Sequence, residues 1–290
     1  MKVVGFSFIR NAIRYDYPVV ESLRSILPVC DEVIVAVGKS EDDTLALVQS
    51  IAPDKIRIIE TEWDDSLREG GRVLAEETNK ALRAVRTDAD WALYIQADEV
   101  LPESSHRPLR AAMEQWKDDK RVEGLLFDYV HFYGSYDYVG DSRRWYRREV
   151  RAVRPDPAVY SYRDAQGFRK DGRSLYVKPA NATMYHYGWV RPPEVQQQRQ
   201  EAFHALWHDD NWVESNVKIY DSFDYSRIDS LARFEGQHPE VMEDRIRRMN
   251  WSFAFDPSSR KLSLKTRVLG WIERITGWRV GEYRNYKLIR

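Results

Sequence analysis

Apolar residues in the first hundred positions fall into short runs separated by stretches of helical spacing. The runs typical of buried strands cover 3–9, 33–37, 56–60 and 91–95. The segments whose apolar residues recur at helical spacing cover 18–27, 44–51 and 70–86. Strands that alternate with helices favour a mainly parallel sheet with right-handed crossovers. The pattern therefore predicts an α/β fold of Rossmann-like layout, with helices flanking the sheet.

After residue 190 the pattern becomes mostly helical. Segments 194–207 and 239–250 have helical spacing, and an apolar stripe runs through the tail that begins at residue 258. The stripe consists of Leu264, Val268, Leu269, Trp271, Ile272, Ile275 and Trp278. We therefore divide the chain into an α/β domain over 1–190 and a mostly helical extension over 191–290.

The tail is also basic, because 258–290 contains nine Lys or Arg against two acidic residues. A basic amphipathic helix with tryptophans is typical of a segment that lies on an anionic membrane surface. A helix that packs on the α/β domain or on a partner subunit is the plainer interpretation. The tail thus predicts either peripheral membrane contact or packing within the protein.

Composition narrows the class of protein. The 290 residues carry a net charge of -1, so the chain as a whole is not suited to binding nucleic acid. A single cysteine, Cys30, excludes an internal disulfide framework and a cysteine-rich zinc site. No apolar run approaches the roughly 18 residues of a membrane span, and the first residues lack the pattern of a signal peptide. We expect a cytoplasmic protein, with any membrane contact peripheral and at the inner face.

The fourth predicted strand ends in the polar sequence Gln96-Ala97-Asp98-Glu99. Ligands of open α/β sheets bind just outside the carboxyl ends of the strands. Ionised carboxylates there need a cation or several donors, because desolvating them alone is costly. Mg²⁺ and Mn²⁺ prefer oxygen ligands and accept imidazole less often. Asp98 is therefore the best single candidate for a metal ligand, and a solvated acidic turn is the plainer alternative.

Five short motifs follow one another along 1–190. They are Asn11 after the first strand, 38–44 after the second, Asn79-Lys80-Ala81 in the third helix, 96–99, and 184–190 with His186. In this order they resemble family 2 glycosyltransferases, enzymes of the GT-A fold that use nucleotide-diphosphate sugars. The resemblance implies a hexosyltransferase-type enzyme that moves a sugar to a hydroxyl acceptor with inversion, in cell-surface glycan or polysaccharide synthesis. It makes 1–190 the catalytic domain and a glycan or a lipid-linked molecule the acceptor.

The resemblance also implies a set of site residues. A divalent metal, Mn²⁺ or Mg²⁺, would be held by Asp98, Glu99 and His186. The residues expected at the nucleotide sugar are Ile9, Arg10, Asn11, Gly38, Arg72, Asn79, Gln96 and Ala97. His131 is a weaker candidate for a metal ligand, and its alternative roles are structural or facing the acceptor.

An inverting transferase needs a general base, usually a carboxylate, to take the proton of the acceptor hydroxyl. Asp164 is the best candidate, because its loop over 162–168 is flanked by aromatic residues and contains the permissive Gly167. An ordinary turn residue is the plainer interpretation, and the runners-up are Asp128, Asp137 and Asp141. The aromatic segment 127–138 is suited to sugar rings, and the arginines of 143–151 are suited to phosphates.

Two positions depart from the family. Gln96 stands where the first carboxylate of an Asp-x-Asp motif is expected, and Val37 stands where an aspartate usually ends the second strand. Because an amide cannot neutralise a divalent ion, we expect Glu99, with help from the arginines of 143–151, to restore the charge. The alternative function is a degenerate glycosyltransferase-like protein that binds without catalysis.

Two other classes of nucleotide-binding enzyme do not fit the sequence. A sugar-phosphate nucleotidyltransferase would carry a glycine-rich loop after the first strand, whereas 9–12 contains no glycine. A dinucleotide-binding enzyme would carry Gly-x-Gly-x-x-Gly, which is absent. A glycosyltransferase therefore remains the leading prediction.

Overall fold

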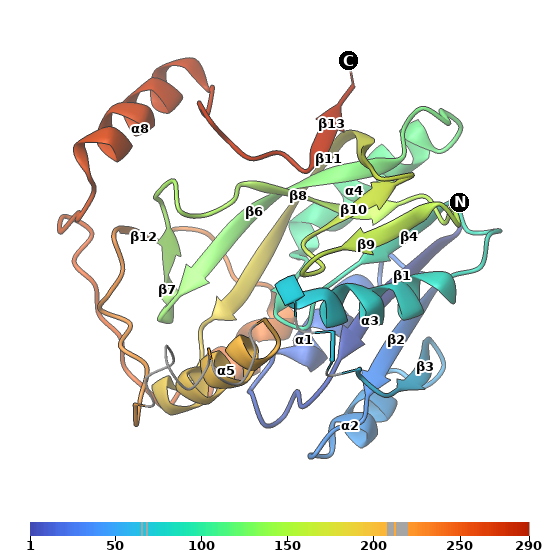
Figure 1. Cartoon of the computed structure of the whole chain (residues 1–290), viewed down its shortest axis with the longest axis horizontal. Helices are drawn as coiled ribbons and strands as arrows, with labels where there is room; N and C mark the ends of the chain where they lie inside the picture. Colours follow the sequence, from blue (N-terminus) through green and yellow to red (C-terminus); the bar gives the residue numbers. More distant parts are fainter. Residues whose placement is uncertain (65, 68, 208–211, 213–219, 290) are drawn as a thin grey trace.

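The structure, a computed structural model, describes residues 1–64, 66–67, 69–207, 212 and 220–289, and Arg290 of the basic tail lies outside them. One large sheet forms the centre of the molecule (Figure 1). The order of its main strands is β3-β2-β1-β4-β8-β6-β11-β10-β9. Strand order and pairing direction divide this sheet into a parallel part and a mixed part.

The four strands predicted in the first hundred residues form the parallel part. They are β1 Val3–Ile9, β2 Glu32–Gly38, β3 Ile56–Thr61 and β4 Trp91–Tyr94. β1 pairs in parallel with β2 and β4, and β2 pairs in parallel with β3. The intervening helices are α1 Val19–Ile26, α2 Thr44–Ile51 and α3 Arg72–Arg83, which begins after the 3-10 turn η1 Glu69–Gly71. The predicted α/β class is confirmed.

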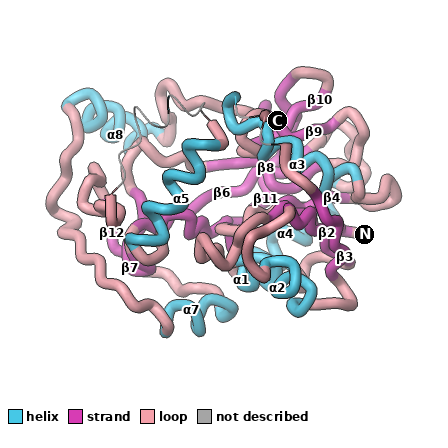
Figure 2. The backbone as a smooth tube through the Cα atoms, turned by 60° about the horizontal axis from the view of Figure 1, so that its bottom comes forward, coloured by secondary structure: helices cyan, strands magenta, loops and turns pink. Residues whose placement is uncertain are grey.

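Successive residues of these strands face two separate cores. On one face, Leu93 of β4 belongs to the same apolar cluster as Leu23 of α1. On the other face, Phe6 of β1 belongs to the same cluster as Leu82 of α3. Because strand side chains alternate, a strand covered on both faces needs a continuous apolar run. Helices accordingly lie on both sides of the sheet (Figure 2).

Beyond β4 the sheet becomes mixed. The added strands are β6 Gly124–Tyr133, β7 Ser135–Gly140, β8 Arg148–Val153, β9 Val159–Tyr162, β10 Gly167–Lys170 and β11 Arg173–Trp189. β8 is antiparallel to β4 and β6, whereas β11 runs parallel to β6. Connections as short as the single Gly134 between β6 and β7 permit only antiparallel neighbours. The parallel layout expected from the sequence thus describes the first half of the sheet.

A short strand, β5 Glu99–Val100, brings the acidic end of β4 beside the histidine segment. β5 pairs antiparallel with β11 and sets His186 opposite Glu99. The amide of Tyr187 also donates to the Asp98 carbonyl at 2.8 Å. The helix that follows, α4 Glu103–Trp116, packs in the same apolar cluster as Leu23 of α1 and Leu93 of β4. Two motifs far apart in the sequence are therefore neighbours.

The C-terminal extension is attached to the same sheet. Its elements are α5 Pro193–Ala205, β12 Leu231–Arg233, η2 Glu240–Met242, α7 Glu243–Arg247, α8 Leu264–Thr276 and β13 Tyr286–Leu288. β12 pairs with β7, and β13 pairs with β11. Among the described residues, no helix combines the length and the apolar character needed to cross a bilayer.

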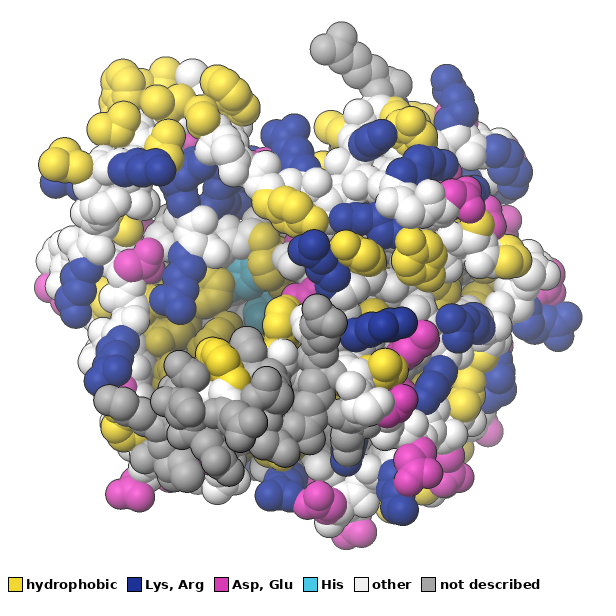
Figure 3. Space-filling view, viewed as in Figure 1, with side chains coloured by type: hydrophobic (Ala, Val, Ile, Leu, Met, Phe, Trp, Pro, Cys, Tyr) yellow, Lys and Arg dark blue, Asp and Glu magenta, His cyan; other side chains and the backbone are white. Residues whose placement is uncertain are grey.

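Helix α8 is joined to the α/β domain mainly through charged groups. Glu273 accepts a hydrogen bond from Arg143 at 2.5 Å and lies 3.2 Å from Arg147. A hollow remains between α8 and the rest of the molecule on the face shown in Figure 3. Helix α8 therefore contacts the α/β domain through ion pairs, and most of the apolar stripe is left uncovered.

Candidate active site

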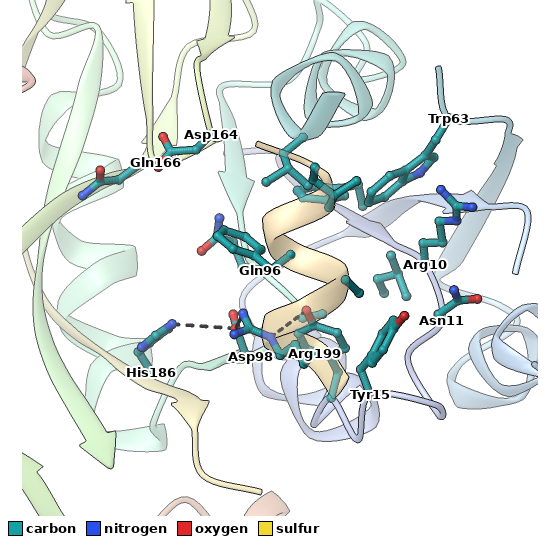
Figure 4. Close-up of a pocket in the computed structure, with 18 of the residues that line it drawn as sticks. Arg10, Asn11, Tyr15, Trp63, Gln96, Asp98, Asp164, Gln166, His186 and Arg199 are labelled. Atoms are coloured by element: carbon teal, nitrogen blue, oxygen red, sulfur yellow. Dashed lines mark hydrogen bonds and ion pairs between the residues drawn. The ribbon is translucent and has the colours of Figure 1, made fainter. Parts of the chain in front are cut away.

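A cavity of about 560 Å³ opens at the carboxyl ends of β1 and β4 (Figure 4). Its walls come from the loop after β1, the loop after β4, the β9–β10 hairpin, the end of β11 and helix α5. The expected site residues that line it are Ile9, Arg10, Asn11, Gln96, Ala97, Asp98, Asp164 and His186. The fold thus gathers most of the residues that sequence reasoning selected.

Asn11 fixes the loop after β1 to the loop after β2. Its backbone has a φ of 51°, a left-handed conformation that asparagine tolerates better than most residues. Its Oδ1 accepts from the amide of Glu41 at 2.8 Å, and its own amide donates to Ser40 Oγ at 3.0 Å. Asn11 therefore shapes the cavity floor through the backbone of two loops.

Trp63 forms one wall of the cavity and was missed by sequence reasoning. The guanidinium of Arg10 lies 5.2 Å from the centre of its ring, and the Phe8 ring lies 5.9 Å away. Gly38 does not line the cavity, but a Cβ atom there would overlap the Trp63 indole. Gly38 thus acts by letting Trp63 approach the strand, and the sequence contains no pattern that selects Trp63.

Asp98 and His186 face each other across 3.7 Å, measured from Oδ2 to Nε2. Burial lowers the pKa of both His186 and His131, which favours the neutral imidazoles at neutral pH. His131 Nε2 lies 2.8 Å from the Tyr146 carbonyl, which can only accept, so the proton of His131 is on Nε2. Its bare Nδ1 then accepts from Nδ1–H of His186, 3.1 Å away. His186 consequently presents an Nε2 lone pair to the Asp98 carboxylate.

The space beside this pair suits a cation. A Cβ atom on Gly188 would stand 2.7 Å from His186 Nε2 and 2.8 Å from Asp98 Oδ2, so the glycine leaves that space open. Two lone pairs that converge without a proton between them are stabilised by a positive charge. Mg²⁺ and Mn²⁺ commonly take one or two protein ligands and complete their shell with water and substrate phosphates. The donor set therefore fits a divalent metal.

Glu99 does not join this pair, contrary to expectation. Its carboxylate accepts from Arg151 Nη2 at 2.8 Å, from the Tyr129 hydroxyl at 2.7 Å and from the backbone N–H of Gln96 at 3.1 Å. The side chain is fully buried and does not line the cavity. With its oxygens engaged, Glu99 holds the loop after β4 in place, and this placement does not favour its predicted role as a metal ligand. Among the described residues, no three His, Cys, Asp or Glu side chains converge as a metal site.

The positive charge near Asp98 comes from arginines that were not expected. Arg199 of α5 places Nη2 3.5 Å from Asp98 Oδ2 and donates through Nε to the Tyr17 hydroxyl at 3.0 Å. Arg191 is fully buried and donates to the Tyr15 carbonyl at 2.7 Å. Burial and the neighbouring Arg199 lower the pKa of Arg191 to about 10.

These arginines act on the Asp98–His186 pair itself. Burial alone would raise the pKa of Asp98, but the positive charges of Arg199 and Arg191 help to lower it. The arginines of 143–151, which we expected to serve the site, do not line this cavity. Arg143 and Arg147 bind Glu273, whereas Arg151 binds Glu99. The supporting charge is therefore supplied from the C-terminal extension.

Two further expected residues lie outside the cavity. Asn79 of α3 is buried, and its Oδ1 accepts from the Ser161 amide of β9 at 2.7 Å, so it joins helix to strand. Arg72 is exposed at the first residue of α3. Neither of these side chains, both predicted to contact the nucleotide sugar, lines the cavity.

Asp164 lines the cavity on its β9–β10 side, next to Gln166 (Figure 4). Its neighbours Arg163 and Ala165 have φ values of 56° and 62°, which give the hairpin a tight turn. Burial raises the pKa of Asp164. Gln166 is held from behind, because its Nε2 donates to Glu149 at 2.7 Å. None of the three runner-up aspartates lines this cavity.

Comparisons with known proteins concern the fold alone. No protein-family model matches the chain, and no curated protein matches it. Residues 1–349 of S. aureus TarS in complex with UDP match with a TM-score of 0.42 and 13% identity, over 76% of this chain and 68% of that one. Glucosyl-3-phosphoglycerate synthase from Mycobacterium tuberculosis, in complex with Mn²⁺, UDP and phosphoglyceric acid, matches with a TM-score of 0.30 and 16% identity, over 45% and 43%. Scores this low carry no argument about chemistry.

Proposed function

We propose that the chain is a glycosyltransferase that moves a sugar from a nucleotide-diphosphate sugar to a hydroxyl acceptor. The observation that carries the proposal is the Asp98–His186 pair, whose lone pairs converge beside an open space at 3.7 Å. A metal ion held by both atoms would supply positive charge to a departing diphosphate. Mn²⁺ or Mg²⁺ suits these ligands.

Diphosphate recognition also draws on the arginines. Arg199 lines the cavity within 3.5 Å of Asp98, so its guanidinium is close to where a metal-bound diphosphate would lie. Charge-assisted contacts of this kind stabilise negative charge more strongly than neutral hydrogen bonds. On the other side of the cavity, the Trp63 ring offers an apolar face to a nucleoside.

Asp164 is the general base of the proposed reaction. Its carboxylate takes the proton of the acceptor hydroxyl while that oxygen forms a bond to the anomeric carbon. The bond from the anomeric carbon to the diphosphate oxygen breaks on the opposite side, so the configuration inverts. A carboxylate whose pKa is raised by burial is better matched to this task at neutral pH than an ordinary aspartate.

The reaction would take place on the cytoplasmic side of the membrane, in the synthesis of cell-surface glycans or polysaccharides. A second candidate function is a degenerate protein that binds a nucleotide sugar without turnover. The observation that favours it is Gln96, whose amide lines the cavity and donates to the Tyr94 hydroxyl at 3.3 Å, where a carboxylate is expected.

Thermal unfolding with UDP, GDP, CDP and dTDP, each with and without Mn²⁺, tests the proposal. One nucleoside diphosphate should raise the midpoint in the presence of Mn²⁺, since a ligand at 100 times its dissociation constant adds about 2.7 kcal/mol. The matching nucleotide sugar should then release nucleoside diphosphate when acceptors are added. Binding without release under any acceptor would favour the degenerate protein, and no binding would contradict both functions.

A further inference from the structure

A second cavity, of about 1230 Å³, lies between the strands β6–β8 and helix α8. Tyr146 lines both this cavity and the first one. His131 lines the second cavity and contacts His186, which lines the first. The two spaces therefore share a wall of two side chains beside the proposed metal pair. Histidine side chains are visible at the bottom of the hollow beside α8 in Figure 3.

The second cavity has an excess of positive charge. Six arginines line it, 143, 147, 260, 267, 274 and 279, against the two carboxylates of Asp141 and Glu273. Three of the guanidinium groups converge on one acceptor, since Arg143, Arg147 and Arg279 lie 2.5, 3.2 and 3.6 Å from Glu273. Arg147 also pairs with Glu282 at 2.9 Å, so two carboxylates face these three cations and one positive charge remains. A phosphate group, which carries more charge and more acceptor oxygens, would complete this cluster.

Helix α8 also brings apolar side chains to the cavity. Leu264, Val268 and Trp271 line the cavity, and together with Ile275 they form one stripe along the helix. These four side chains are 53% to 78% exposed. A soluble sugar phosphate would gain nothing from such a stripe, whereas a long hydrocarbon chain would bury it. Tryptophan and leucine on a helix that also carries Lys and Arg are typical of a segment at a membrane interface.

We propose that the second cavity is the acceptor site and binds the phosphate headgroup of an acceptor anchored in a membrane by a long apolar chain. The arginines hold the phosphate, and the chain leaves along the α8 stripe toward the bilayer. The headgroup then lies beside the shared wall at Tyr146 and His131. This inference rests on the proposed glycosyltransferase function and names its acceptor class.

Vesicle sedimentation tests the acceptor site. The protein is mixed with vesicles of phosphatidylcholine alone, of phosphatidylcholine with a polyprenyl phosphate, and of phosphatidylcholine with phosphatidylglycerol. We expect sedimentation with the polyprenyl phosphate vesicles at least about tenfold stronger than with the other two, because a phosphate monoester offers more charge to the arginines. Equal sedimentation with phosphatidylglycerol, or none with any vesicle, would overturn the proposal.

Paired variants locate the binding. Arg267→Gln with Arg274→Gln, and Val268→Ser with Trp271→Ser, each change two residues that line the cavity. Both double variants should lose about tenfold in binding. The control Lys265→Gln with Lys287→Gln removes the same charge from residues outside the cavity, and Leu288→Ser removes an exposed apolar side chain elsewhere. An equal loss in the controls would overturn the site.

Donor binding separates this inference from the function on which it rests. Thermal stabilisation by UDP or another nucleoside diphosphate with Mn²⁺ should be unchanged in both cavity variants. If wild type shows that stabilisation but no preference for polyprenyl phosphate, the acceptor class is wrong and the transferase function stands. If wild type shows no stabilisation by any nucleoside diphosphate, the proposed function fails whatever the vesicles show.

Discussion

The Nδ1 atoms of His131 and His186 lie 3.1 Å apart, and this contact decides which face of His186 is basic. The Tyr146 carbonyl fixes the proton of His131 on Nε2, so the shared proton between the rings belongs to His186 Nδ1. The remaining nitrogen of His186 points to Asp98. One backbone carbonyl thus orients two imidazoles in series.

The first prediction concerns His131. Replacing it by phenylalanine removes the acceptor for Nδ1–H of His186 and should weaken Mn²⁺ affinity by about 10- to 100-fold, the usual cost of losing a group that orients a metal ligand. Asparagine, whose Oδ1 can accept the same bond, should restore most of that affinity. Titration of Mn²⁺ measures both variants. Equal affinity in the phenylalanine and asparagine variants would show that the hydrogen bond does not matter.

The second prediction concerns Arg199. Arg199→Met removes a cation 3.5 Å from Asp98 and should weaken metal-free binding of a nucleoside diphosphate by about tenfold or more, because a hydrogen bond to a charged group contributes about 1.5–3 kcal/mol. Arg199→Lys should lose less. Calorimetric titration in chelator checks both variants, and an unchanged affinity for Arg199→Met would remove the guanidinium from diphosphate recognition.

The third prediction separates catalysis from donor binding. Asp164→Asn keeps the shape of the side chain but cannot accept a proton, so the rate of transfer should fall by about 10²- to 10⁴-fold. The stabilisation by nucleoside diphosphate with Mn²⁺ should persist. Asp128→Asn, which changes an aspartate outside the cavity, is the matched control. Transfer at the wild-type rate in Asp164→Asn would assign the base to another group.

The fourth prediction concerns the pH dependence of stability. The carboxylate of Glu149 is buried and accepts hydrogen bonds from Asn285 and Gln166. Burial raises its pKa from 4.5 to about 7. Between these values the folded protein keeps a proton that the unfolded chain has lost. The free energy of unfolding should therefore fall as pH rises from about 4.5 to about 7, by roughly 2–3 kcal/mol at about 1.4 kcal/mol per pH unit.

Glu149→Gln should remove this contribution. The free energy of unfolding of the variant should therefore rise relative to that of wild type between pH 5 and pH 8. Urea unfolding at the two pH values measures the difference. Glu60→Gln, at an exposed position of β3, is the control and should follow wild type. A constant difference between Glu149→Gln and wild type at both pH values would contradict the raised pKa.

The sequence predicted the parallel strands and most of the residues that line the candidate cavity because both depend on local pattern. Continuous apolar runs mark strands covered on both faces, and the polar residues that follow must lie at the sheet edge. The local pattern could not show which of Asp98 and Glu99 faces the cavity. Neighbours in an extended segment point in opposite directions, and the structure turns Asp98 to the cavity and Glu99 to Arg151.

The groups that the sequence did not reveal reach the site from distant segments. Arg199 lies on α5, after the strand that carries His186, and Trp63 lies in the loop after β3. Neither belongs to a motif, and each becomes a cavity residue only when the sheet and α5 are assembled. The mixed half of the sheet was also missed, because the aromatic and basic residues of 127–151 suggested ligand contacts and hid the strand pattern.

Electron paramagnetic resonance of Mn²⁺ tests the central claim most directly. The free-ion signal should fall when wild-type protein and a nucleoside diphosphate are added together, beyond the fall with nucleoside diphosphate alone. Asp98→Asn and His186→Ala should each abolish that extra loss of signal, whereas Glu99→Gln should weaken it only through displacement of the loop after β4. Retention of full Mn²⁺ binding in Asp98→Asn, with the protein folded, would contradict the account.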